Sequence, residues 1–397
     1  MAGDTTPADP TTAGPTAAAP SDTAPTAAAP TPFEELGGWP GVLTGLLSGT
    51  SLSSGSAETV MGQVLSGDAS PAQIASLVTA LRAKGESVEE MTGFVRSMVN
   101  HAVPLVLPEG MDVIDTCGTG GDRLRSINVS TIAALVVAAT GAKVCKHGGR
   151  ASSSAVGAAD VLEALGVVAD LGPAGVARCI DVVGMGFCFA PRFHPAMRFA
   201  APVRKELGIP TVFNYLGPLA NPGRARYQVV GVSNPAMADK MLGVLAANGA
   251  VRAVVVYGDD GLDELSTTGP STVHELIKDA DGRYETSAYR VDPAVLGFAP
   301  ASLDDLRGGD AAFNAAAILR VIGGQASPHR DIAVLNAAAA LVVVGAAPDL
   351  PSGIVQAGQV IDDGRAAEVL QSLIRVSQEA SAAEASAAEA STAEASD

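Results

Sequence analysis

Cysteine is scarce in this sequence and follows no spacing that is typical of metal binding. The chain has 397 residues and four cysteines, and no two of them form a CxxC pair. Four cysteines in a chain of this length do not make a disulfide framework either. Cys145 and Cys188 stand in apolar runs and are expected to be small core residues. A disulfide-stapled or zinc-ribbon fold is therefore excluded, and a reducing compartment is expected.

Long apolar runs are also missing. The N-terminus lacks the basic start and apolar segment of a signal peptide. Two uncharged stretches, Ser126–Ala142 and Ile332–Pro348, are 17 residues long each, whereas a helix that crosses a membrane needs about 20 apolar residues. Both stretches contain Ser, Thr or Asn. We expect them to be buried helices of a cytoplasmic protein that has no membrane partner.

Charged residues are few, and basic residues are fewer than acidic ones. Only 17% of the residues are charged, and 42 Asp and Glu against 25 Lys and Arg give a net charge of −17. Three acidic residues in 1–32 and five in 377–397, with no basic residue in either segment, leave −9 for residues 33–376. A moderately acidic body is not typical of a nonspecific nucleic-acid binder, so no nucleic-acid partner is expected. The 47% apolar content is enough to bury a core.

The two ends of the chain have low sequence complexity. Residues 1–32 contain ten Ala, eight Thr and seven Pro, which predicts a disordered arm. Residues 377–397 repeat Glu with a period of five, with Ala and Ser between, and offer no apolar face to pack. We expect this acidic segment to be a solvated tail, and neither end to carry the chemistry.

Between these ends the pattern changes once. Residues 33–104 predict a small all-helical domain, completed by helices near 193–210, because Ser70 and Ser87 each begin a capping box ahead of an apolar helical stripe. Residues 105–376 alternate short apolar runs with helical stretches. That alternation is typical of an α/β domain with a mainly parallel central sheet. The apolar runs lie at 113–114, 143–145, 211–213, 227–232 and 253–257, and the helical stretches at 128–140, 155–165 and 237–248.

The loops after these strands are the places to look for a site, because ligands bind beyond the carboxyl ends of parallel strands. The first loop, residues 115–122, reads Asp-Thr-Cys-Gly-Thr-Gly-Gly-Asp and precedes a helix that begins near Asn128. Its glycines allow backbone N–H groups to form a nest for an anion beside the positive end of a helix. It matches neither the P-loop nor the GxGxxG fingerprint. A phosphate site is one interpretation, and a tight turn with an ordinary cap is the other.

A second loop, residues 146–154, joins two basic side chains, two further glycines and three serines after an apolar run. Lys146 and Arg150 can clamp a phosphate whose shell Ser hydroxyls complete. The alternative is a solvated basic turn, with His147 a capped structural histidine. Two anion-type loops on one sheet favour the phosphate interpretation.

Further candidates are two acidic side chains and one arginine. Asp263 and Glu264 follow the apolar run 253–257, where adjacent carboxylates suit Mg²⁺, a cation that prefers oxygen ligands. An acidic surface turn is the alternative. Arg204 can pair with a substrate carboxylate through two parallel hydrogen bonds, or it is a helix-surface arginine beside Glu206.

Taken together, these motifs resemble those of the anthranilate phosphoribosyltransferases. The resemblance is collinear over about residues 36–350. It implies a small helical domain plus a large α/β domain, the nucleoside phosphorylase fold, and transfer of a 5-phosphoribosyl group from phosphoribosyl pyrophosphate to anthranilate in tryptophan biosynthesis. It also implies a homodimer joined through the helical domain. The matching segments are DTCGTGGD (115–122), NVST (128–131), KHGGRASSS (146–154), FAPRFHPAMR (189–198), PVRKELGIPTVFNYLGPLANP (202–222) and GDDGLDELSTTGPS (258–271).

The same resemblance assigns roles to residues of this sequence, without naming a general base. The implied donor-binding residues are Gly118, Gly121, Asp122, Ser126, Asn128, Val129, Ser130, Thr131, Lys146, His147, Gly148, Gly149, Arg150, Ala151, Ser152, Ser153 and Ser154. The implied acceptor-binding residues are Gly118, His147, Gly149, Pro191, His194 and Arg204. Ser130, Asp263 and Glu264 are the implied ligands of two Mg²⁺ ions.

Three positions depart from the family pattern. Gly149 stands where the family usually has an Asn that touches anthranilate, and Arg125 stands where Asn is usual after the first loop. Met197 lies where a longer polar or aromatic side chain often lines the acceptor entrance. The alternatives to the anthranilate reaction are a paralogue with another aromatic acceptor, nucleoside phosphorolysis, and a noncatalytic protein that binds phosphate ligands.

Overall fold

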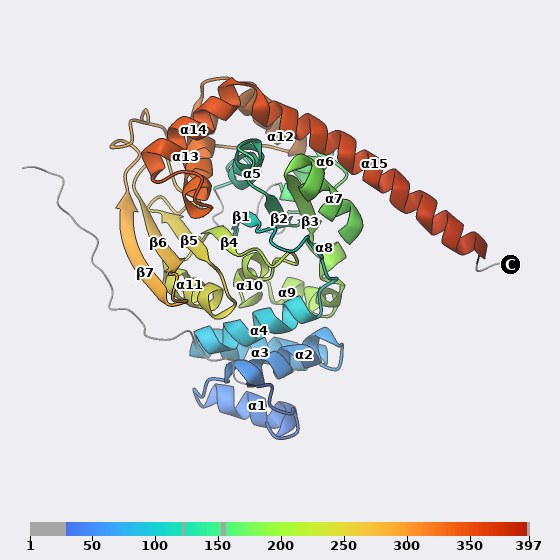
Figure 1. Cartoon of the computed structure of the whole chain (residues 1–397). Coiled ribbons are helices and arrows are strands. Elements are labelled where there is room, and N and C mark those ends of the chain that lie inside the picture. Colours follow the sequence, from blue (N-terminus) through green and yellow to red (C-terminus); the bar gives the residue numbers. More distant parts are fainter. Residues whose placement is uncertain (1–28, 121–123, 152–155, 395–397) are drawn as a thin grey trace, which may run out of the picture.

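The computed structural model describes residues 29–120, 124–151 and 156–394. A group of four helices forms the N-terminal end of the molecule, and a larger α/β unit lies against it (Figure 1). Ser70 and Ser87 form the predicted capping boxes, each accepting from the third helical N–H while the Gln or Glu there accepts from the cap N–H. The four helices are α1 (Gly38–Leu47), α2 (Ser54–Leu65), α3 (Pro71–Lys84) and α4 (Val88–Asn100).

The α/β unit is built on a seven-stranded sheet of order β3-β2-β1-β4-β5-β6-β7. The first five strands in this order are parallel, and β6 and β7 are antiparallel to their neighbours. The predicted fold class is therefore confirmed. The strands are β1 (Ile114–Gly118), β2 (Val144–Gly148), β3 (Met185–Phe189), β4 (Tyr227–Gly231), β5 (Arg252–Gly258), β6 (Ser271–Lys278) and β7 (Tyr284–Val291).

Each face of the sheet is covered by its own helices. Val229 and Val254 pack into one core, which holds the buried helices α5 (Val129–Ala139) and α13 (Pro328–Val343) that were expected from the two uncharged stretches. No helix among the described residues is long and apolar enough to span a membrane. The other helices of this core are α6 (Ala158–Ala164), α7 (Pro173–Val183), α12 (Ala311–Ile322), α14 (Leu350–Asp362) and α15 (Arg365–Glu394).

The opposite face of the sheet shares its core with the N-terminal helices. Val230 and Val255 point to this second core, which is continuous with α1 to α4. Helix α9 packs on α3, and α10 and α11 pack on α4. The elements between the sheet and the N-terminal helices are α8 (Ala190–Phe193), η1 (Pro195–Phe199), α9 (Ala201–Leu207), α10 (Phe213–Leu219), η2 (Pro235–Met237) and α11 (Ala238–Ala247).

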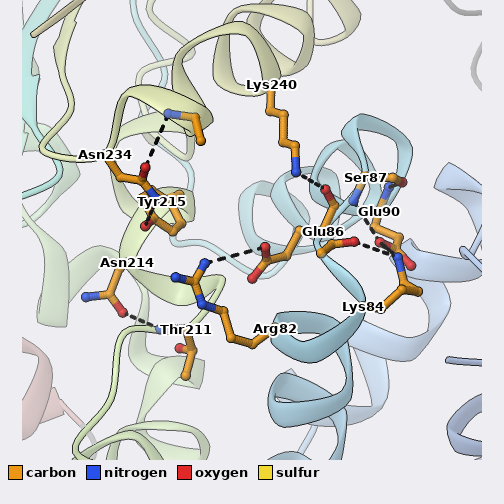
Figure 2. Close-up of polar contacts among 12 residues, drawn as sticks. Arg82, Lys84, Glu86, Ser87, Glu90, Thr211, Asn214, Tyr215, Asn234 and Lys240 are labelled. Carbon is orange, nitrogen blue, oxygen red and sulfur yellow. Dashed lines mark hydrogen bonds and ion pairs between the residues drawn. The ribbon is translucent and has the colours of Figure 1, made fainter. Parts of the chain in front are cut away.

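Polar contacts also join the two units, around the turn between α3 and α4 (Figure 2). Lys240 on α11 donates to the Glu86 carbonyl at 2.8 Å. Beside it, Lys84 and the fully buried Glu90 form an ion pair at 2.9 Å. The N-terminal helices are thus fixed to the α/β unit by both apolar packing and hydrogen bonds.

Two expectations from the sequence are wrong. Residues 211–213 form no strand, because the Asn214 side chain accepts from the Thr211 N–H at 3.0 Å and the chain turns into α10. The segment 377–394 is not a detached tail, since it continues α15. Ser377 and Ala380 are buried against the body, so the first turns of this segment do pack.

Candidate active site

A cavity of about 370 Å³ opens at the carboxyl ends of β1 and β2 and reaches the loop after β5. Most of the predicted site residues within the described segments line it together: Gly118, Ser126, Asn128, Val129, Ser130, Thr131, Lys146, His147, Gly148, Gly149, Arg150, Arg204, Asp263 and Glu264. Ala151, Pro191 and His194 do not line it. Gly121, Asp122, Ser152, Ser153 and Ser154 lie outside the described residues.

Glycines bring the Asp263 loop against the strand ends. The Asp263 carboxylate accepts from the Gly120 N–H at 2.7 Å. A Cβ added at Gly118 would lie 2.4 Å from Asp263 Oδ2, and one at Gly231 would lie 1.5 Å from the Asp263 carbonyl oxygen. Only glycine at both positions permits this approach. The glycines of the first loop therefore also allow the Asp263 carboxylate to lie close to the end of β1 in the cavity.

Lys146 is a buried cation beneath the cavity. Its side chain is 1% exposed, and its ammonium donates to the Thr116 carbonyl at 2.6 Å and to Ser130 Oγ at 3.2 Å. Burial raises the pKa of the neighbouring Asp115 to about 6, although the Lys146 charge and the Asn221 side chain oppose the rise. Because Lys146 points at the first turn of α5, its charge adds to the positive end of that helix.

The N-terminus of α5 faces the cavity, and no side chain caps it. Asn128 stands at the cap position, but its amide donates to the Val156 carbonyl at 3.2 Å and accepts from Asn314 at 3.0 Å. Thr131 Oγ1 is buried without a hydrogen-bond partner among the described residues. The Val129 and Thr131 N–H groups already donate to the Ile127 and Asn128 carbonyls. What favours a phosphate here is the positive end of a helix that has no side-chain cap.

Two arginines of the candidate phosphate loops line the cavity, and one of them, Arg150, differs from the prediction. Arg150 lines the cavity, but its guanidinium pairs with Asp160 at 3.0 Å and Glu163 at 2.7 Å, so it is already neutralised by α6. Arg125 lines the cavity with a left-handed backbone, φ 57°. Non-glycine residues in this conformation carry strain and cluster at functional sites.

His147 is a neutral histidine that uses one of its two ring nitrogens in a hydrogen bond within the described residues. Its Nδ1 lies 3.1 Å from the Gly217 carbonyl, which makes Nδ1 the protonated nitrogen. Its Nε2 is buried without a partner among the described residues, and its ring centroid lies 5.1 Å from that of His194. Burial, and then His194, lower the pKa of His147 to about 3. His194 lies behind it, with Nε2 3.0 Å from the Ala220 carbonyl.

Arg204 on α9 is a cation at another wall of the cavity. Its guanidinium lies 5.4 Å from the centroid of the Phe213 ring, and no ion pair joins it to Glu206 or to any other described carboxylate. Burial lowers its pKa, but an arginine remains protonated at neutral pH. A half-buried, unneutralised guanidinium is suited to a ligand carboxylate.

The donor atoms present fit Mg²⁺. Asp263, Glu264 and Ser130 offer oxygen ligands around one cavity, and Mg²⁺ prefers oxygen. Within the described residues no group of three or more His, Cys, Asp and Glu side chains could hold a metal ion by itself. This suits a cation that is bound by one or two carboxylates and completes its shell with water and substrate phosphate.

Several residues of the site were not singled out in the sequence. Phe213, Asn214 and Gly217 line the cavity from α10, which begins where the sequence predicted a strand over residues 211–213. Asn336 on α13 accepts from the Leu265 N–H at 2.9 Å and donates to its carbonyl at 2.8 Å, which fixes the loop that carries Glu264. A lone Asn inside a long uncharged helix was the available signal.

Comparison with known proteins decides the family. Residues 40–102 match the family model of the glycosyl transferase helical bundle domain, and residues 110–367 match that of the glycosyl transferase a/b domain. The chain is 50% identical over 338 residues to the anthranilate phosphoribosyltransferase of Rhodococcus jostii, covering 84% of this chain and 91% of that protein. This chain belongs to the anthranilate phosphoribosyltransferase family.

Solved structures of anthranilate phosphoribosyltransferases have the same fold. The enzyme from Thermus thermophilus aligns with a TM-score of 0.79 and 39% identity, covering 85% of this chain and 99% of that one. The Saccharomyces cerevisiae enzyme, solved in complex with PRPP and Mg, aligns with a TM-score of 0.78 and 28% identity over 86% of this chain and 98% of that one. The resemblance read from the motifs is thus confirmed across both units.

Proposed function

We propose that this protein transfers the 5-phosphoribosyl group of phosphoribosyl pyrophosphate (PRPP) to the amino group of anthranilate, a step of tryptophan biosynthesis. The C1–O bond to the diphosphate breaks with its electron pair leaving on pyrophosphate. The C1–N bond forms from the amine lone pair, and the amine proton passes to solvent. The observation that supports this most directly is a single cavity in which Lys146, the start of α5 and the Asp263–Glu264 pair meet.

The donor end of this reaction has to neutralise a diphosphate. We assign the diphosphate to the uncapped N-terminus of α5 and the adjoining glycine loop, with the Lys146 ammonium behind them. Mg²⁺, when bound, supplies positive charge to the leaving group. Ser130, Asp263 and Glu264 would hold it, and two ions per site are part of this proposal. Because the leaving group is stabilised in this way, the reaction depends more on positioning of the two substrates than on a strong base.

The acceptor end is assigned to the side of the cavity that holds Arg204. Its guanidinium would pair with the anthranilate carboxylate, which orients the amine toward the ribosyl carbon. The free Nε2 of neutral His147 can accept a hydrogen bond from a bound ligand, whereas a protonated imidazole could not. Aromatic amines are already uncharged near neutral pH, so no general base is assigned.

The decisive experiment follows anthranilate fluorescence in the presence of Mg²⁺ and PRPP. We expect the fluorescence to disappear as product forms, and the double variant Asp263→Ala, Glu264→Ala to weaken Mg²⁺-dependent use of PRPP. Arg178→Gln is a matched control, since Arg178 pairs with Glu379 on the exposed surface. If the enzyme binds PRPP tightly but leaves anthranilate unchanged at high concentration, the acceptor assignment fails.

A paralogue with another aromatic acceptor is the second candidate, and Gly149 favours it. Among the described residues, a Cβ at Gly149 would meet only the Ala190 Cβ, at 3.9 Å, so the described wall has room where the family usually carries an Asn side chain. Running the same assay with substituted anthranilates and other aromatic amines distinguishes the two. A higher kcat/KM for a larger amine than for anthranilate would favour the paralogue.

We also propose that the protein is a cytoplasmic homodimer joined through the helical domain. Leu47 on α1 is 77% exposed, which leaves an apolar side chain on that domain for a second copy to cover. Sedimentation equilibrium tests the dimer, and Leu47→Glu should shift it toward monomer.

A further inference from the structure

A second cavity, of about 380 Å³, lies away from the active site. It is bounded by α4 of the helical domain, by the end of α11 and by the segment that leads into β4. Because that segment enters β4 at Tyr227, this cavity lies at the amino ends of the strands, whereas the active site lies at their carboxyl ends. No part of the proposed reaction uses it.

The polar wall of this cavity is positively charged. Arg96, Arg224 and Arg226 line it, and no Asp or Glu of the described segments does. Arg226 pairs with Asp112 at 3.0 Å, whereas Arg224 forms no ion pair or hydrogen bond through its side chain with any described residue. Three guanidinium groups around one cavity are unusual in a chain with a net charge of −17. This local excess of positive charge attracts anions.

Arg96 is held ready for a ligand. Its Nη2 donates to the Ala247 carbonyl at 3.1 Å and its Nε to the Asn248 side chain at 3.3 Å. These two bonds fix the guanidinium plane between α4 and α11, and they leave Nη1 without a partner among the described residues. A guanidinium fixed in advance loses little entropy when it binds a carboxylate or phosphate.

Arg224 stands in a strained backbone conformation. Its φ is 51°, and the one other non-glycine residue with a positive φ in the described part of the chain is Arg125, which lines the active site. A left-handed backbone is unfavourable for a residue with a Cβ, and such strain clusters at active sites and ligand-binding sites. A glycine there would remove the strain and the charge together.

The rest of the lining combines apolar side chains, Val95, Val99, Leu219 and Leu245, with the amides of Asn100, Asn221, Gln228 and Asn248. A ligand that pairs with the arginines and also contacts the apolar side chains would carry an anionic group and an apolar body. We propose that this cavity is a binding site for a small organic anion, an aromatic or aliphatic carboxylate or phosphate ester, that contacts Arg96 and Arg224. The cavity volume is within the range of small-molecule sites.

The test is calorimetric titration of the full chain with benzoate and with phenyl phosphate at low ionic strength. Either probe can also enter the active site, so the variants have to locate the binding. Arg224→Gly should weaken the binding at this cavity by about tenfold or more, the loss expected for one charge-assisted hydrogen bond. Arg204→Gln should remove only binding at the active site, and Arg178→Gln should change neither.

Arg224→Asn is a second variant, because Asn tolerates a left-handed backbone and keeps the fold comparable. Circular dichroism checks that both variants are folded. Binding that both Arg224 variants weaken and Arg204→Gln preserves supports the proposal, and the probe bound more tightly identifies carboxylate or phosphate chemistry. The proposal is overturned if the wild-type chain binds neither probe up to about 10 mM, or if the Arg224 variants leave all binding unchanged.

Discussion

Gly118→Ala is the substitution that tests the geometry of the active site most directly. The added Cβ would lie 2.4 Å from Asp263 Oδ2 and 3.1 Å from Asp263 Cγ, so the carboxylate has to rotate away. Rotation breaks its hydrogen bond from the Gly120 N–H, 2.7 Å long in the wild-type chain. A hydrogen bond to a charged group contributes about 1.5–3 kcal/mol.

The loss should appear in the response to Mg²⁺. If Asp263 holds the cation, we expect the Mg²⁺ concentration that gives half-maximal activity to rise roughly ten- to a hundredfold, since about 1.4 kcal/mol corresponds to tenfold. The assay follows anthranilate fluorescence over a Mg²⁺ series at saturating PRPP. Gly62→Ala on α2, outside the cavity, is the matched control, because its Cβ would lie 3.9 Å from Ser97 Oγ, an ordinary contact.

A double-variant cycle separates this effect from direct obstruction of the substrate. In an Asp263→Ala background there is no carboxylate for the new methyl group to displace, so Gly118→Ala should then cost little more activity. Additive losses in the cycle, or an unchanged Mg²⁺ response in Gly118→Ala itself, would refute the argument that Gly118 acts through Asp263.

Three further predictions concern the acceptor, the pH and the C-terminal helix. Gly149→Asn should lower the KM for anthranilate several-fold in steady-state kinetics, because it adds an amide in open space; an unchanged or higher KM would contradict this. His147 has its pKa lowered to about 3 by burial, so its share of stability is full above the unfolded pKa of about 6.5 and is lost as the pH falls toward 3. The free energy of unfolding, measured with urea at several pH values between 6 and 4, should therefore fall with decreasing pH in the wild type. In His147→Gln its slope against pH should be smaller by about 1.4 kcal/mol per pH unit. Equal slopes in the two proteins would disprove it. Deleting 377–397 should lower the free energy of unfolding by about 2–4 kcal/mol, because it removes the buried Ser377 and the hydrogen bonds that Glu384 accepts from the Gly172 N–H. Deleting 386–397 should leave the Tm within a degree or two. Equal effects of the two deletions would contradict the packing of this helix.

The residues that the sequence singled out near the strand ends line one cavity because they are local to those ends. Lys146 lies in the carboxyl half of β2 and the Asp263–Glu264 pair in the loop after β5, and the carboxyl ends of parallel strands meet at one edge of the sheet. The pairing of Arg150 was not predictable in the same way. Its partners, Asp160 and Glu163, lie on the next helix, and only the turn after β2 directs the guanidinium toward them.

The strands that were missed show where periodicity fails. β6 and β7 form the antiparallel end of the sheet, with β7 at its edge, and both mix polar and apolar residues without a long apolar run. At 211–213 the residues have high strand propensity, but the Asn214 side chain binds the Thr211 N–H and favours a helix start. Local hydrogen bonds of this kind override propensity, and they are visible only in the folded chain.

The order of the strands has a consequence for how the enzyme regains activity after unfolding. β1 pairs with β2 at Val144 but also with β4 along its whole length, from Tyr227 to Gly231, and these partners are far apart in the chain. Sheets with such high contact order fold slowly, because distant segments have to meet before their contacts are rewarded. Since the Asp263 loop packs on the ends of both β1 and β4, the cation site is completed only when this long-range pairing is in place. In a refolding experiment, Mg²⁺-dependent activity should therefore return after the helical signal and report the last step of assembly.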